Sequence, residues 1–140
     1  FDGPPNSPAH LIFQHDKEMS ISKKDIAGLI KRMLYKLPKQ QGELRKVFPG
    51  CFIEKKSFEA LIKELDKEGK NVFLLDERGV SIRKLKIKAN EVFIIGDQEG
   101  FPVEKRKLLK TIDKISVGPK IYFASQVFTI INNEIDLQSI

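Results

Sequence analysis

The residues best suited to chemistry lie in two glycine-containing loops in the second half of the chain. Gly96-Asp97 follows one apolar run and Gly118-Pro119 follows another. Glycine adopts positive φ readily and lets backbone approach a flat ligand, whereas the Asp97 carboxylate could accept a proton. Asp97 could equally hydrogen-bond its own loop as a structural cap. We therefore take these two loops as the candidate site and leave both interpretations of Asp97 open.

The segment from Glu91 to Asp136 contains the elements that must position these loops. Val92 to Ile95 is an uninterrupted apolar run, which predicts a central strand covered on both faces. Pro102 opens a basic helical segment, and a second strand is predicted over Lys114 to Val117. From Ala124 to Asp136 apolar residues recur at helical spacing, so a helix is predicted although the composition favours a strand. This alternation indicates an α/β domain with its ligand crevice at the strand ends.

The first half of the chain continues the alternation. Apolar spacing and capping residues predict a helix that begins at Ser20 or Ser22 and another that begins at Ser57 and stops at Gly69. The other elements predicted here are a strand at 11–13, a polar loop at 39–49, a short edge or connecting strand at 51–53, a buried strand at 71–75, a turn at 76–79 and a basic hairpin arm at 80–89.

Composition limits the possible functions. The 140 residues are 41% hydrophobic and 31% charged, which predicts one soluble, globular domain. No apolar run is long enough for a membrane span and the start does not resemble a signal peptide, so we expect no membrane and a cytoplasmic location. Cys51 is alone, and His10 and His15 have no third ligand nearby, so no metal site is predicted. Neither a dinucleotide fingerprint nor a Walker motif is present, which disfavours NAD and ATP.

The formal net charge of +6 favours a polyanionic partner. Lysine and arginine crowd the polar faces of the predicted helices, including Lys105, Arg106 and Lys107. These faces could contact phosphates, or they could be ordinary solvated surfaces; charge alone does not separate the two.

Several short motifs, taken in order, resemble one known class of enzyme. They are Ile95-Gly96-Asp97, Phe101, Ser116-Val117-Gly118-Pro119, Ala124-Ser125-Gln126 and Thr129 to Asp136. Together they look like the SPOUT-class methyltransferases, and within that class they most resemble the archaeal tRNA pseudouridine-54 N1-methyltransferases. Segments near residues 2–5, 26–30, 49–50 and 58–61 resemble the same family, so the likeness covers nearly the whole chain.

The resemblance implies a SPOUT-like α/β knot with a mostly parallel sheet and a carboxyl-terminal trefoil knot. It implies S-adenosyl-L-methionine as cofactor, N1-methylation of pseudouridine in the T-loop of tRNA, and a homodimer to which the helix from Ala124 contributes. Residues 1–140 would be a single domain that lacks the amino-terminal strand and helix of the family. The rival interpretations are an rRNA methyltransferase of the same class and a non-catalytic RNA-binding module.

Asp97 is the candidate proton acceptor, because it is the carboxylate nearest to the predicted pocket. The resemblance implies roles for further residues. By position, the residues expected to line the cofactor pocket are Leu75, Gly96, Val117, Gly118, Pro119, Lys120, Ile121, Tyr122 and Val127.

Overall fold

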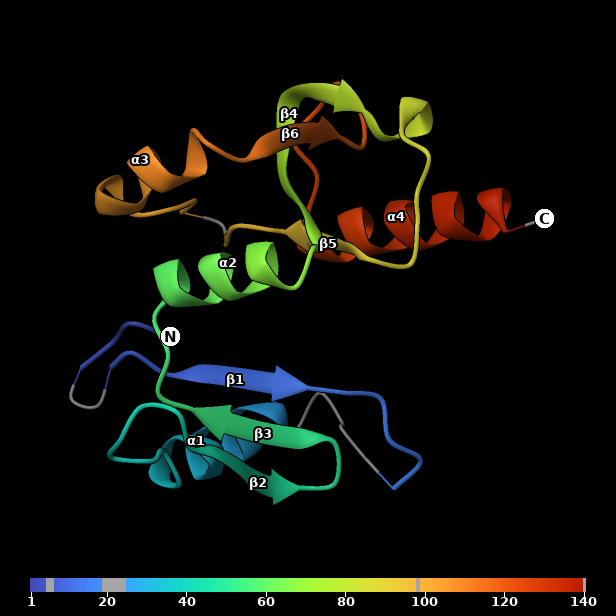
Figure 1. Ribbon diagram of the computed structural model, residues 1–140. Coiled ribbons are helices and arrows are strands. Elements are labelled where there is room, and N and C mark those ends of the chain that lie inside the picture. Colours follow the sequence, from blue (N-terminus) through green and yellow to red (C-terminus); the bar gives the residue numbers. More distant parts are fainter. Residues whose placement is uncertain (5–6, 19–24, 98, 140) are drawn as a thin grey trace. The chain divides into compact units, whose positions relative to one another are not determined.

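The computed structural model describes residues 1–4, 7–18, 25–97 and 99–139, and the chain divides into two compact units (Figure 1). The first unit comprises Phe1–Leu61 and the second comprises Ile62–Ile140. Their sheets differ in kind, antiparallel in the first and parallel in the second, so we describe each unit by itself. The expectation of one domain without its amino-terminal strand and helix stays a prediction.

The first unit is a three-stranded antiparallel sheet packed against one helix. The sheet has the order β1-β3-β2, and the helix contributes Leu29 and Met33 to a core that also contains Ala9, Cys51 and Ile53. The apolar positions of the helix lie three and four residues apart, so they form the stripe that faces the sheet. The elements are β1 (His10–Phe13), α1 (Ile26–Tyr35), β2 (Leu44–Phe48) and β3 (Cys51–Glu54).

Two predictions for the first unit were wrong. The polar loop expected at 39–49 contains β2, and β3 is the central strand and not an edge or a connector. The reason is the turn at Pro49-Gly50, where Gly50 has φ of 73° and Phe48 pairs with Cys51. Proline followed by a glycine with positive φ suits a tight two-residue turn, which folds β2 back onto β3. The predicted helix starts at Ser20 and Ser22 lie outside the described residues.

The second unit is built on a parallel sheet with the order β5-β4-β6. Figure 1 shows α4 as a long helix that leads to the end of the chain. The strands are β4 (Asn71–Ser81), β5 (Glu91–Ile94) and β6 (Asp113–Ser116). The helices are α3 (Arg106–Leu109) and α4 (Ala124–Gln138), with short 3-10 turns η1 (Ile82–Lys84) and η2 (Val103–Lys105). Helix α2 (Phe58–Lys67) begins in the first unit and ends in the second.

The core of the second unit confirms the helix that periodicity predicted from Ala124. Val127 and Ile131 of α4 are buried together with Ile82 of η1 and Ile115 of β6. Strand propensity is overridden because a helix places these two side chains on one face, where they cover the sheet. The start of the helix after Ser57 is also confirmed, since the Ala60 N–H donates to Ser57 Oγ at 3.2 Å.

Three predictions for the second unit were wrong. Val92 to Ile95 corresponds to the edge strand β5, and β4 is central. Residues 76–79 are not a turn that ends the strand, because β4 leaves its pairing at Leu75 and returns at Val80, both opposite Ile115. Residues 82–89 form η1 and an extended connection instead of a hairpin arm. All three features depend on which strands are neighbours in the sheet, and a local pattern of apolar residues does not predict the neighbours of a strand.

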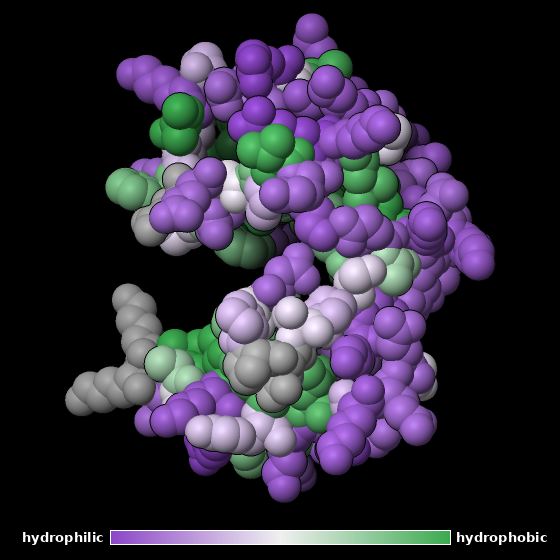
Figure 2. Space-filling view, turned by 90° about the vertical axis from the view of Figure 1, so that its left-hand side faces the viewer, coloured by the Kyte–Doolittle hydropathy of each residue, from purple (hydrophilic) through white to green (hydrophobic). Residues whose placement is uncertain are grey.

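One face of the molecule is largely polar (Figure 2). Hydrophilic side chains cover most of the face in Figure 2, with smaller apolar areas between them. None of the helices in the described part of the chain is sufficiently long and apolar to pass through a bilayer.

Candidate functional site

A pocket of about 350 Å³ opens in the second unit beside the part of β4 where its pairing with β6 is interrupted and beside the segments that follow β5 and β6. Its lining combines apolar side chains, two aromatic rings and several carboxylates. The described residues that line it are Leu75, Asp76, Glu77, Ile95, Gly96, Asp97, Glu99, Gly100, Phe101, Ser116, Val117, Gly118, Lys120, Ile121, Tyr122 and Val127. Parallel strands present their carboxyl ends at one edge of a sheet, so segments far apart in the sequence meet there.

The structure brings nearly all of the sequence-predicted site residues to this pocket. Asp97 lies on its wall with the eight expected cofactor residues other than Pro119. Pro119 is exposed, and it is outside the set of described residues that line the pocket. Sequence reasoning therefore located the pocket, whereas the roles of these residues remain predictions.

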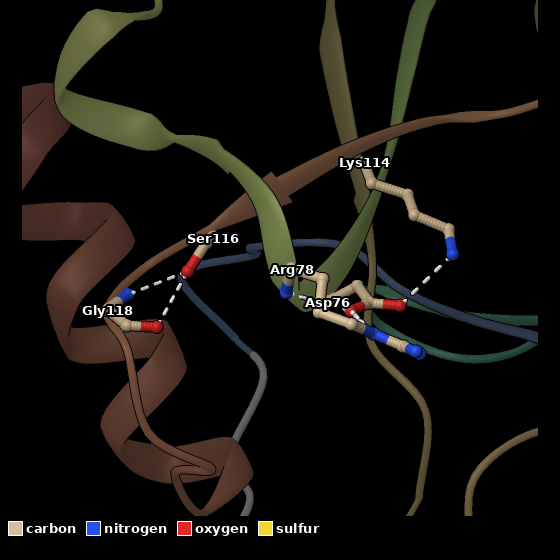
Figure 3. Close-up of polar contacts among 5 residues, drawn as sticks. All are labelled: Asp76, Arg78, Lys114, Ser116 and Gly118. Atoms are coloured by element: carbon tan, nitrogen blue, oxygen red, sulfur yellow. Dashed lines mark hydrogen bonds and ion pairs between the residues drawn. The ribbon is translucent and has the colours of Figure 1, made fainter.

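The Gly118 loop is held by the side chain that precedes it. Ser116 is buried, and its hydroxyl donates to the Gly118 carbonyl at 2.6 Å and accepts from the Gly118 N–H at 3.2 Å (Figure 3). A serine that bonds to backbone two residues on fixes a tight turn. The loop is thus ordered by the protein's own contacts.

Both glycines make room for aromatic rings of the pocket wall. A Cβ on Gly118 would lie 2.6 Å from the Tyr122 hydroxyl oxygen, and a Cβ on Gly96 would lie 2.9 Å from Cε2 of Phe101. These distances are shorter than any ordinary contact. The interpretation that these glycines leave space for a flat ligand therefore needs correction, because the space above each is filled by a ring that itself lines the pocket.

Asp97 caps its own loop, which is one of the two roles considered for it. Its Oδ1 accepts a hydrogen bond from the Glu99 N–H at 2.9 Å, and its carbonyl accepts from the Gly100 N–H at 3.0 Å. Gly100 has φ of 76°, which closes this turn. Oδ2 has no hydrogen-bond partner among the described residues, and the side chain is exposed at the pocket. The capping contact therefore leaves one carboxylate oxygen accessible.

Asp76 is one of the pocket residues that the sequence prediction missed. Its Oδ1 accepts from the Arg78 N–H at 2.9 Å and from Arg78 Nε at 3.3 Å, and its Oδ2 lies 3.2 Å from Lys114 Nζ (Figure 3). The Arg78 backbone N–H is the largest cause that lowers the pKa of Asp76 to about 2, with smaller contributions from the Arg78 and Lys114 side chains. Asp76 directly follows the apolar run at 71–75, and that position could have indicated a site residue. It was not considered as one because residues 76–79 were predicted to be a turn.

The charge of the pocket favours a cation. Among the described lining residues are four carboxylates, from Asp76, Glu77, Asp97 and Glu99, and one ammonium group, from Lys120. The described residues contain no cluster of three side chains suited to a metal ion. An apolar slot edged with carboxylates suits an organic ligand that carries positive charge.

Comparison with known proteins gives the family. A family model described as "Putative SAM-dependent RNA methyltransferase" matches residues 1–140, the full length of the chain. The chain belongs to this family. Membership confirms the resemblance drawn from the glycine-loop motifs and the segment after Ala124.

Individual relatives agree with the family. A "Putative pseudouridine methyltransferase" from Vibrio cholerae is 40% identical over 115 residues, which are 81% of this chain and 57% of that protein. The tRNA (pseudouridine(54)-N(1))-methyltransferase of Methanocella arvoryzae is 32% identical over 96% of this chain and 69% of its own length. The chain spans about half the length of most of the curated relatives it matches, for example 49% of one from Vibrio vulnificus.

A solved structure shares the fold. The crystal structure of Archaeoglobus fulgidus Nep1 bound to S-adenosylhomocysteine aligns with a TM-score of 0.62 at 18% identity, over 92% of this chain and 57% of that one. The predicted mixed α/β fold with a parallel sheet is therefore confirmed.

Proposed function

We propose that this protein is an S-adenosyl-L-methionine-dependent methyltransferase that methylates N1 of pseudouridine in the T-loop of tRNA. The observation that carries the proposal is the pocket at the strand ends, which combines apolar walls with carboxylates in a member of a methyltransferase family. The name of the Methanocella arvoryzae relative supports the choice of acceptor.

The pocket residues fit the cofactor in size and in charge. Small-molecule sites commonly enclose about 300–1,000 Å³, and this pocket is near the lower end of that range. Leu75, Val117, Ile121 and Val127 would surround the apolar part of the nucleoside, with Gly96, Gly118 and Tyr122 shaping the walls. The carboxylates would favour the sulfonium and ammonium charges, and Lys120 would favour the carboxylate of the methionine portion. When bound, the cofactor supplies an electrophilic methyl group.

Asp97 is the proposed acceptor of the N1 proton, directly or through water. Its Oδ2 is open at the pocket, while Oδ1 is held by the Glu99 N–H. Asp76 is a poorer base, because a carboxyl group with a pKa of about 2 has little affinity for a proton. The remaining contribution of the protein is to position the two reactants, which can supply most of the rate in such a transfer.

The oligomeric state is a further part of the proposal. We expect a homodimer in which α4 contributes to the interface, because large apolar side chains on and before this helix are exposed. They are Ile121, Phe123, Phe128 and Leu137, with exposed fractions of 87%, 79%, 58% and 60%. Apolar side chains in such numbers on one segment favour a protein contact. Light scattering on the purified protein measures this directly.

The carboxyl-terminal trefoil knot and the cytoplasmic location complete the proposal. Similarity to the fold of Nep1 supports the knot, and a crystal structure of the full-length protein traced through 76–140 tests it. Fluorescence of a tagged protein in cells tests the location.

Two experiments separate this function from its rivals. Calorimetry with S-adenosyl-L-methionine should show binding, and its absence would favour the non-catalytic RNA-binding module. Mass spectrometry of nucleosides from tRNA and rRNA of a deletion strain should show loss of N1-methylpseudouridine from tRNA alone. Loss from rRNA instead would identify the rRNA methyltransferase.

A further inference from the structure

A second pocket in the second unit has a cationic lining. Its volume is about 520 Å³, and the charged side chains around it are Arg78, Arg106, Lys110 and Lys114, with Asp76 and Glu99. Cations outnumber carboxylates in this described lining, the reverse of the first pocket. The two pockets therefore suit ligands of opposite charge.

Two of the four cations are fixed by Asp76. Lys114 Nζ lies 3.2 Å from Asp76 Oδ2, and Arg78 Nε lies 3.3 Å from Asp76 Oδ1. The contact with Arg78 uses its Nε, so its two terminal Nη groups have no hydrogen-bond partner among the described residues. A guanidinium held by one edge with its other donors open is suited to an oxyanion.

The other two cations come from one turn of helix. Arg106 and Lys110 are four residues apart, and the Lys110 N–H donates to the Arg106 carbonyl at 3.1 Å. Residues at this spacing share a helix face, which places both side chains at the pocket. Neither forms an ion pair with another residue in the described part of the chain. Within the described residues, therefore, no ion pair neutralises the charge of either side chain.

The second pocket adjoins the first. Asp76, Glu99, Gly100 and Phe101 line both, so a ligand in one pocket lies within a few residues of a ligand in the other. A nucleotide whose base reaches the methyl group of a cofactor held in the first pocket carries a phosphate on either side of its ribose. We propose that the second pocket binds a backbone phosphodiester of the RNA strand, next to the nucleotide that is methylated. This inference rests on the proposed function and assigns a phosphate contact within it.

Position distinguishes this site from an ordinary basic surface. Lys107 is exposed on the same helical turn as Arg106, but it is not among the described residues that line the pocket. The sequence prediction treated residues 105–107 as one basic face. The structure separates Arg106 from Lys107, and so provides a control of nearly the same charge and location.

The test measures binding of the cognate tRNA by the full-length protein and two variants over about 50–200 mM salt. Each phosphate contact that is lost lowers the steepness of the plot of log K against log salt concentration by about 1. Arg106→Gln with Lys110→Gln should lower affinity about tenfold or more and reduce the slope. Lys107→Gln should leave the slope unchanged. Equal losses in both variants, or an unchanged slope in the double variant, would overturn the proposal. Melting curves check that all three proteins fold alike.

Two further measurements separate failure of this site from failure of the proposed function. If the wild-type protein methylates tRNA while the double variant keeps its slope, the phosphate site is rejected and the function stands. If the wild-type protein binds tRNA through these residues but transfers no methyl group, the site stands and the function is rejected. Inorganic phosphate should compete weakly with tRNA; tight phosphate binding that tRNA does not displace would assign the pocket to a free anion and overturn the proposal.

Discussion

The backbone of Gly79 lies directly against the backbone of Ile115. A Cβ on Gly79 would be 2.6 Å from both the carbonyl carbon and the nitrogen of Ile115. This approach is possible because β4 leaves its pairing at Leu75 and returns at Val80, both opposite Ile115. The residues in between form the wall that carries Asp76. Gly79 therefore lets β4 return to its pairing with β6 directly after the segment that carries Asp76.

Gly79→Ala should destabilise the protein by about 1–3 kcal/mol, since backbone must move to accept the methyl group. Chemical denaturation monitored by circular dichroism measures the change. Gly28→Ala is the control: a Cβ at Gly28, within α1, has no neighbour within 4 Å. That change should stabilise by up to about 1 kcal/mol, because alanine favours helix. A neutral effect of Gly79→Ala would show that the crossing at Ile115 is looser than described.

Gly118 and Tyr122 should be energetically coupled in cofactor binding. Gly118→Ala pushes the Tyr122 ring aside, so the affinity for S-adenosyl-L-methionine should fall, and Gly118→Val should have a larger effect. In a Tyr122→Ala background the ring is absent, and Gly118→Ala should then cost much less. Calorimetry on the four proteins should give a coupling of about 0.5–3 kcal/mol. Strict additivity would mean that Gly118 serves the ligand directly.

Asp97→Asn should lower turnover by about a hundredfold to ten-thousandfold, the usual contribution of general base assistance. The asparagine oxygen can still accept from the Glu99 N–H, so the loop and the cofactor affinity should change little. Single-turnover methylation of tRNA by the full-length protein measures the rate, with a melting curve beside it. Normal turnover would assign proton removal to solvent. A large fall in melting temperature would identify Asp97 as a loop cap alone.

Asp76 should make stability depend on acid pH. Its pKa in the folded state is lowered from 3.8 to about 2, so its ionised form stabilises the fold above pH 3.8. This contribution should be lost as the pH falls from 3.8 through 2. Its size should be on the order of 1–2 kcal/mol, because the pKa is lowered to about 2 at a side chain that is 14% exposed.

Unfolding free energies of the wild type and Asp76→Asn, measured from pH 7 to pH 2, test this directly. The variant should be less stable at neutral pH, and the difference should narrow in acid. Asp113→Asn is the control, since Asp113 is an exposed carboxylate on β6 that has no ion pair with another described residue. A constant difference between wild type and Asp76→Asn at all pH values would mean that the shift in pKa does not contribute to folding.

The features that depend on local spacing could be predicted from the amino-acid sequence. Apolar residues three and four apart predicted α4, and its buried Val127 and Ile131 confirm that helix. Glycine after an apolar run predicted where the strands end. Since the carboxyl ends of parallel strands converge, the loops at Gly96 and Gly118 were expected to meet. The cofactor residues came from the family resemblance, and eight of those nine line one pocket together with Asp97.

Three features could be read only from the folded chain: which strand is central, where β4 ends, and which side chains lie against Gly96 and Gly118. These depend on contacts between residues distant in the sequence, such as Gly79 with Ile115 and Asp76 with Lys114. A run of apolar residues records that a segment is covered, but not by which neighbour, so it could not show that β5 is an edge strand. For the same reason, the sequence showed a basic face at 105–107, and only the fold brings Arg106 to a pocket and leaves Lys107 outside it.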